Sequence, residues 1–167
     1  MIPKKIVGKK ITLRILGPQY FEEYHKMFSP IVRKAIGLSD KTLEQTKAFL
    51  ATRVTDMKVG KTLFYCIFDK LDKKLIGAIE IREPDYPDGQ LGTWINEQYW
   101  GEGHYQEALD LIIKTYFTSK EIDNVNAYVE TNNIRSLKAH QKYGFKIIRE
   151  FEKDGKKYYE IMYKKRK

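Results

Sequence analysis

The chain has 167 residues, of which 31 are lysine or arginine and 22 are aspartate or glutamate, giving a net charge of +9. This length suits one domain, residues 1–167, which should bury roughly 70% of its unfolded surface without disulfide or metal staples. The single cysteine, Cys66, excludes a disulfide framework and lies in an apolar run typical of a buried strand. No apolar stretch is long enough to span a bilayer, and the basic N-terminus lacks the apolar core of a signal peptide, so we expect a cytoplasmic protein.

The positive charge is concentrated at the two ends of the chain. A solvated surface with a frayed tail is the simpler interpretation, and a nucleic-acid patch is the alternative. Positive potential would also attract an anionic ligand, or an acidic or ribosome-associated partner, over long range. The residues concerned are Lys4, Lys5, Lys9, Lys10, Lys153, Lys156, Lys157, Lys164, Lys165, Arg166 and Lys167.

The first half of the chain predicts a strand, two helices and a hairpin. No repeat or linker divides it. Apolar alternation and helical spacing give the strand Lys10–Leu16, the helices Gln19–Phe28 and Leu43–Asp56, and the paired strands Leu63–Asp69 and Lys74–Ile81 across residues 70–73. Pro84, Pro87 and Asp88-Gly89 then predict a loop.

A glycine-containing turn lies between the next strand, Leu91–Asn96, and a long helix. The helix shows one apolar stripe, formed by Tyr105, Ala108, Leu109, Ile112 and Tyr116. Gly101 and Gly103 therefore lie at a helix N-terminus, where free backbone N–H groups and the helix dipole favour an anion such as phosphate. Any tight strand-to-helix turn can use two such glycines. The spacing does not match a nucleoside triphosphate loop or a dinucleotide fold.

The last third predicts a strand, a helix and a hairpin. Asn124–Val129 has strand character, and the helix Ile134–Tyr143 begins after a capping asparagine and stops at Gly144. Lys146–Phe151 and Lys156–Tyr163 then flank Lys153-Asp154-Gly155, which has Asp-Gly turn chemistry. The sum is a mixed α/β domain.

Three linked motifs carry a resemblance to a known family. Gln98-x-x-Gly101-x-Gly103, Asn133-x-x-Ser136 and Gly144-Phe145 occur in the order and spacing of the GNAT superfamily of acyl-CoA-dependent N-acetyltransferases. The segment from Tyr99 to Leu109 looks closest to the branch of ribosomal-protein N-terminal acetyltransferases and spermidine-type acetyltransferases. The resemblance covers nearly the whole chain.

The resemblance implies a fold and a cosubstrate. The expected GNAT fold is a single mixed, mostly antiparallel twisted sheet of six or seven strands, with helices on both faces. Its central parallel strands, Leu91–Asn96 and Asn124–Val129, splay apart to hold acetyl-CoA. The implied reaction moves an acetyl group from acetyl-CoA to a primary amine by direct transfer in a ternary complex, without a metal or a covalent residue.

The resemblance also implies which residues hold the cosubstrate. Backbone N–H groups around Gly101, Gly103, His104 and Tyr105 would hold the pyrophosphate, and Gln98 occupies the family's Gln/Arg position. Ile95 and Asn96 would lie beside the pantetheine arm, with an unpaired N–H near Ile95 as an oxyanion donor. Asn133, with Ser136 one turn on, matches the family asparagine that bonds the arm, and a helix-cap role for Asn133 is equally compatible.

Two side chains are candidates for proton transfer. Many family members use a tyrosine four residues after the serine, where this chain has His140. Its imidazole could protonate the leaving thiolate, although a helix histidine often only packs. Glu80 lies mid-strand between isoleucines and is the candidate base for the amine, because burial would raise its pKa. The alternative is a charge on the solvent face of a sheet.

The residues expected to shape the acceptor pocket contain no recognisable sequence motif, so the acceptor is not identified. A ribosomal-protein N-terminus, a polyamine, an amino acid and an aminoglycoside all stay open, as does a homodimer. A non-catalytic alternative is a domain that senses acyl-CoA or associates with ribosomes or RNA, although the chain lacks an RNA-reading motif.

Overall fold

The computed structural model describes residues 1–71 and 73–166. In chain order its elements are β1 (Lys5–Val7), β2 (Ile11–Ile15), α1 (Phe21–Met27), α2 (Pro30–Ala35), α3 (Leu43–Lys58), β3 (Thr62–Asp69), β4 (Leu75–Arg82), β5 (Leu91–Ile95), α4 (His104–Ser119), β6 (Asn124–Glu130), α5 (Ile134–Tyr143), β7 (Lys146–Lys153) and β8 (Lys156–Lys164), with single 3-10 turns at Pro18–Tyr20 and Glu97–Tyr99.

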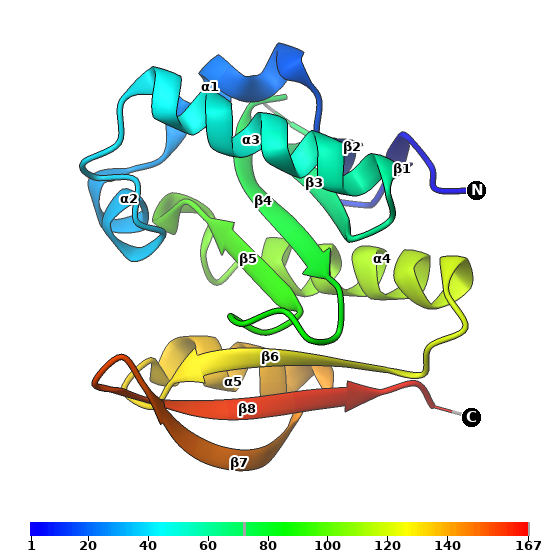
Figure 1. Cartoon of the computed structure of the whole chain (residues 1–167). Coiled ribbons are helices and arrows are strands. Elements are labelled where there is room, and N and C mark those ends of the chain that lie inside the picture. Colours follow the sequence, from blue (N-terminus) through cyan, green and yellow to red (C-terminus); the bar gives the residue numbers. More distant parts are fainter. Residues whose placement is uncertain (72, 167) are drawn as a thin grey trace.

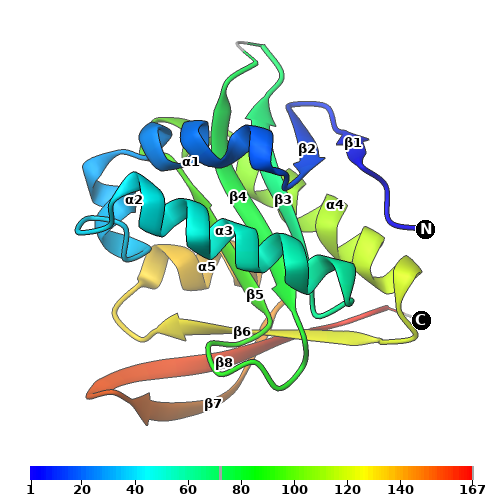
Figure 2. The same cartoon turned by 45° about the horizontal axis from the view of Figure 1, so that its top comes forward.

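The larger sheet has five antiparallel strands in the order β1-β2-β3-β4-β5 and is covered on both faces. Helices α1 and α3 lie over one face and α4 over the other (Figures 1 and 2). All eight residues of β3 are buried, as expected for a strand between two layers. Alternate residues serve two cores: Tyr65 and Ile79 face α4, whereas Phe64 and Ala78 face α1 and α3.

The smaller sheet has the order β6-β8-β7 and packs against α5. Strands β5 and β6 run in the same direction and diverge (Figure 1). Where they are closest, two side-chain amides join the sheets: Asn126 Oδ1 accepts from the Gln90 N–H at 2.9 Å, and Gln90 Oε1 accepts from the Asn126 N–H at 3.0 Å. The sheets are therefore connected at one end of the β5–β6 seam.

The mixed α/β GNAT-type fold expected from the sequence is confirmed, with differences in detail. The described residues form eight strands in two sheets, not six or seven in one, because β5 and β6 diverge without backbone pairing. The short elements β1 and α2 were not predicted. Strand β1 has three residues, too few for visible alternation, and the six residues of α2 depend on Ser29, which accepts from the Val32 N–H.

Both predicted hairpins are present. At the second turn Asp154 and Gly155 have φ values of 51° and 74°, the left-handed conformations that a two-residue Asp-Gly turn requires. The first turn includes Asp72, which lies outside the described residues. Predicted helix bounds shift by a few residues, with α1 starting at Phe21 and α3 ending at Lys58.

Candidate active site

The glycine turn forms an open backbone cradle at the start of α4. Gly101 and Gly103 have φ values of 80° and 88°, and Gly103 is the N-cap residue without a side-chain cap. A Cβ added at Gly101 would meet nothing within 4 Å, and one at Gly103 would meet only the aliphatic part of Lys10. The first helical bond is from the Glu107 N–H to the Gly103 carbonyl. The N–H groups of residues 104–106 thus have no acceptor within the helix, and they suit an anion.

Two side chains of the first turn of α4 hold the cradle in place instead of facing a ligand. His104 is 6% exposed, and its Nε2 lies 2.9 Å from Asp69 Oδ1 at the end of β3. The Glu107 carboxylate accepts from the backbone N–H groups of Lys9, Lys10 and Ile11 at 2.7, 2.8 and 3.0 Å. We therefore restrict the predicted role of His104 in cosubstrate binding to its backbone.

The end of β5 presents a backbone N–H toward the diverging strand. The Asn96 N–H donates to the Ile76 carbonyl at 2.9 Å, so the Gly77–Ile95 pair is a non-hydrogen-bonded pair of the ladder. The Ile95 N–H consequently points away from β4, toward the side on which β6 diverges. Two residues earlier, Thr93 Oγ1 is buried without a hydrogen-bond partner in the described part of the chain. These two groups are therefore candidate hydrogen-bond partners for a polar ligand.

The side chain of Asn96, a residue predicted to lie beside the pantetheine arm, is already hydrogen-bonded within the fold. Its Oδ1 accepts from the Ser29 N–H at 3.0 Å, and its Nδ2 donates to the Met27 carbonyl at 2.8 Å. Asn96 is 6% exposed and connects the end of β5 to the turn between α1 and α2. Gln98, by contrast, is exposed in the 3-10 turn that leads into the cradle.

The predicted residues of α5 lie beside the first turn of α4. Asn133 caps α5, with Oδ1 accepting from the Ser136 N–H at 3.2 Å, which is the structural alternative noted for this asparagine. His140 is 4% exposed. Its Nδ1 lies 2.8 Å from the Ser136 carbonyl, and its Nε2 lies 2.9 Å from the Tyr105 hydroxyl.

A carbonyl oxygen can only accept, so Nδ1 of His140 carries a hydrogen. Burial favours the neutral ring, in which Nε2 accepts from the Tyr105 hydroxyl. Burial lowers the pKa of His140, and burial also raises the pKa of Tyr105. Both ring nitrogens are occupied and the proton faces Ser136, which argues against the predicted role of His140 as the acid for a leaving thiolate. The Tyr105–His140 contact instead connects α4 to α5.

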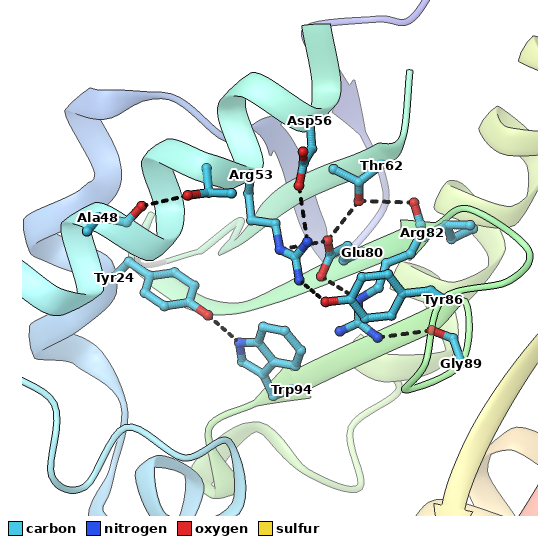
Figure 3. Close-up of polar contacts among 12 residues, drawn as sticks. Tyr24, Ala48, Arg53, Asp56, Thr62, Glu80, Arg82, Tyr86, Gly89 and Trp94 are labelled. Atoms are coloured by element: carbon cyan, nitrogen blue, oxygen red, sulfur yellow. Dashed lines mark hydrogen bonds and ion pairs between the residues drawn. The ribbon is translucent and has the colours of Figure 1, made fainter. Parts of the chain in front are cut away.

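Glu80 lies at the centre of a buried ion cluster (Figure 3). The side chain is 0% exposed, and its oxygens lie 3.3 Å from Arg53 Nε and 3.0 Å from Arg82 Nε. The Thr62 hydroxyl donates to it at 2.7 Å. Because every contact stabilises the carboxylate and solvent does not reach it, the geometry argues against the predicted base role. Glu80 is therefore not the charge on the solvent face of a sheet that was the alternative, but a buried carboxylate with two arginines as partners.

The same cluster fixes the loop between β4 and β5. Arg82 Nη1 donates to the Gly89 carbonyl at 3.1 Å, and Arg53 Nη2 donates to the Tyr86 hydroxyl at 2.7 Å. The centroid of the Tyr86 ring lies 5.2 Å from the Arg53 guanidinium and 4.7 Å from the Arg82 guanidinium. The cluster thereby attaches the loop to α3. No sequence pattern connects Arg53 with Glu80, since they are far apart in the chain.

Sequence reasoning also missed a stacked pair at the mouth of the cradle. The Arg135 guanidinium lies 3.0 Å from the centroid of the Trp100 ring, and Trp100 Nε1 donates to the Ile95 carbonyl at 2.7 Å. The aromatic residue directly before Gly101 and the arginine two residues after Asn133 were visible signals, although only the fold brings them together.

Over the described residues, no helix is long and apolar enough to cross a membrane. In the same part of the chain, no three His, Cys, Asp or Glu side chains are grouped so as to hold a metal ion.

Comparison with known proteins agrees with this geometry. Residues 10–146 match the family model described as an acetyltransferase (GNAT) domain. The chain is 23% identical over 141 residues to the SPbeta prophage-derived uncharacterized N-acetyltransferase YokL of Bacillus subtilis, covering 83% of this chain and 77% of that protein.

Two solved structures have the same fold. Microcin C7 self immunity acetyltransferase MccE, in complex with acetyl-CoA and AMP, has a TM-score of 0.82 at 19% identity, covering 97% of each chain. The ribosomal L7/L12 alpha-N-protein acetyltransferase RimL, in complex with coenzyme A, has a TM-score of 0.80 at 17% identity, covering 98% of this chain and 97% of that one. The chain therefore belongs to the GNAT family of acetyltransferases and is an acyltransferase.

Proposed function

We propose that this protein transfers an acetyl group from acetyl-CoA to a primary amine by direct attack in a ternary complex. The observation that carries the proposal is the open cradle at Gly101 and Gly103 next to the Ile95 N–H, at the point where β5 and β6 diverge. An anion cradle and a free backbone donor are the two features that a phosphate-bearing thioester needs. Acetyl-CoA and coenzyme A bound to MccE and RimL support the same cosubstrate.

In this proposal most of the contacts to the cosubstrate are made by backbone N–H groups. The N–H groups around Gly101, Gly103, His104 and Tyr105 bind the pyrophosphate, and Gln98 is an exposed polar side chain beside them. The Ile95 N–H donates to the thioester oxygen as negative charge develops, a contribution of about 3 kcal/mol where such a donor has been removed. Asn133 and Ser136 belong to the capped first turn of α5 and border the arm. Bound acetyl-CoA supplies the activated acyl thioester.

We propose that protons move without Glu80 or His140. A carbon–nitrogen bond forms and the carbon–sulfur bond breaks, so the amine loses one proton and the thiolate gains one. Glu80 is enclosed by two arginines and His140 directs its proton to a carbonyl. The amine therefore enters in its neutral form, and solvent or the newly formed ammonium group protonates the thiolate.

The acceptor that we propose first is the N-terminal amine of a protein. Support comes from the fold shared with RimL and with the acetyltransferase from Salmonella typhimurium that modifies the N-terminal serine of L7/L12. A polyamine, an amino acid or an aminoglycoside would use the same chemistry. A nucleic-acid role has weaker support, because the chain lacks an RNA-reading motif. In addition, three basic side chains of β7 and β8 pair with acids: Arg149 with Glu160, Lys153 with Asp88, and Lys156 with Glu130.

Thermal unfolding in the presence of acetyl-CoA, free coenzyme A or bulk RNA distinguishes a protein that binds acyl-CoA from one that binds RNA. A ligand at about 100 times its Kd stabilises the folded state by about 2.7 kcal/mol, so acetyl-CoA should raise Tm by several degrees. An amine panel with detection of released thiol then identifies the acceptor. Absence of a shift at millimolar acetyl-CoA would overturn the proposal, and a shift without thiol release from any amine would favour a sensing domain.

A further inference from the structure

Arg135 is held on an aromatic ring at the mouth of the cradle, not on a carboxylate. Its guanidinium stacks on Trp100, whose indole N–H bonds to the Ile95 carbonyl. Within residues 1–71 and 73–166, no ion pair involves Arg135. The arginine therefore has one face on a ring and the N–H donors of its fork available.

The position of Arg135 is unfavourable for a cation in the free protein. It lies in the first turn of α5, which has no acidic residue, and the helix dipole gives that end a partial positive charge. Burial also lowers the pKa of Arg135. An anion close to this turn would interact favourably with both the side chain and the helix end.

Side chains and backbone place this turn beside the cradle. The Tyr105 hydroxyl contacts His140, and Gln106 Nε2 donates to the Ala139 carbonyl at 2.7 Å, so the first turn of α4 lies along α5. Trp100 immediately precedes Gly101. The Arg135–Trp100 contact consequently joins the loop that forms the cradle to the helix that packs on the smaller sheet.

We propose that Arg135 is a phosphate ligand of the cosubstrate and that Trp100 holds its guanidinium in position until the cosubstrate binds. This rests on the proposed use of acetyl-CoA. A planar guanidinium can bond two oxygens of one phosphate group, which a lysine cannot do. When the cosubstrate binds, the Arg135 guanidinium moves from the indole face to a phosphate group. The fluorescence of Trp100 should therefore change on binding.

The test measures affinity and tryptophan fluorescence without turnover. A Trp94→Phe background leaves Trp100 as the single tryptophan. We expect coenzyme A to change its emission and pantetheine, which lacks phosphate, to leave it unchanged. Arg135→Gln should weaken coenzyme A binding about tenfold or more by titration calorimetry and reduce the salt dependence of Kd. Arg135→Lys should recover only part of this loss, because it restores charge without the fork.

Lys138→Gln is the matched control, because it removes the same charge from the exposed face of α5 one turn on. If Arg135→Gln and Lys138→Gln bind coenzyme A equally well, Arg135 is not a phosphate ligand, while the proposed function stands. If pantetheine changes the Trp100 emission as coenzyme A does, the assignment to phosphate is also overturned. If the unmodified protein binds neither acetyl-CoA nor coenzyme A, the proposed function itself fails.

Discussion

Gln90 and Asn126 exchange hydrogen bonds in which the side-chain amide of each residue accepts from the backbone N–H of the other. Gln90 is 3% exposed and also donates to the Tyr116 hydroxyl, and Asn126 donates to Glu160. The pair replaces backbone pairing between β5 and β6 at the single end where they approach. The pair therefore connects the two sheets at this end of the β5–β6 seam.

We predict that Asn126→Val destabilises the protein by about 1–3 kcal/mol, because it leaves the buried Gln90 N–H without an acceptor. Urea unfolding measures the loss. Asn124→Val is the control, since Asn124 lies on the same face of β6 and, among residues 1–71 and 73–166, its side chain bonds only to the adjacent Asp123. Equal stability of the two variants would show that the exchange does not hold the sheets together.

Removing the Glu80 carboxylate should affect stability much more than catalysis. Glu80→Gln leaves the buried Arg53 and Arg82 guanidinium groups poorly compensated, which costs about 3–5 kcal/mol. The fraction that remains folded should keep the kcat/KM of the original protein and its pH profile. A loss of about 100-fold or more in kcat with unchanged Tm would instead restore Glu80 as the base.

His140 should contribute to stability in a pH-dependent manner. Its folded-state pKa is lowered from 6.5 by burial, so the unfolded chain binds more protons. The contribution is complete above the unfolded pKa and declines as the pH falls from about 7 toward the lowered folded value. The stability advantage over His140→Phe should therefore shrink on acidification, as measured by urea unfolding at several pH values. The pH dependence of kcat should be the same in both proteins, and a basic limb lost only in the variant would support the acid role.

A methyl group at Gly103 should weaken acetyl-CoA binding. At φ 88° an alanine is strained, so the backbone of the cradle would have to shift, and its Cβ would lie 3.5 Å from Lys10 Cε. We expect calorimetry to show at least a tenfold rise in Kd, which corresponds to a loss of about 1.4 kcal/mol of binding free energy. Gly155→Ala is the control at φ 74° in the β7–β8 turn, where a Cβ meets nothing within 4 Å. It should have a similar backbone cost and an unchanged Kd.

The elements that the sequence predicts well are those with strong local signals. Periodicity identified β3, β4 and α4, and the capping asparagine and Gly144 gave the bounds of α5 as they are observed. The cradle at Gly101 and Gly103 was visible because positive φ at a helix start selects glycine.

The roles of polar side chains were less predictable, because they depend on partners distant in the chain. Glu80 meets Arg53 from α3, His140 meets Tyr105 from α4, and Asn96 meets the turn after α1. In each case a residue type suited to chemistry or ligand contact has its polar atoms occupied by the fold. Spacing along one element cannot reveal a partner on another.

The Glu107 carboxylate, in the first turn of α4, is bound by the backbone at the N-terminal end of the chain. By accepting from the backbone N–H groups of Lys9, Lys10 and Ile11, this carboxylate is held by the segment that leads into β2. A Cβ at Gly8 would lie 2.7 Å from the carboxyl carbon of Glu107, so a larger residue there would displace this carboxylate. Deleting the segment before β2, or displacing it with a bulky N-terminal fusion, would release a negative charge beside the cradle. We expect such a shortened or tagged protein to bind the cosubstrate less tightly, because the released carboxylate would compete with the bound anion for the helix start.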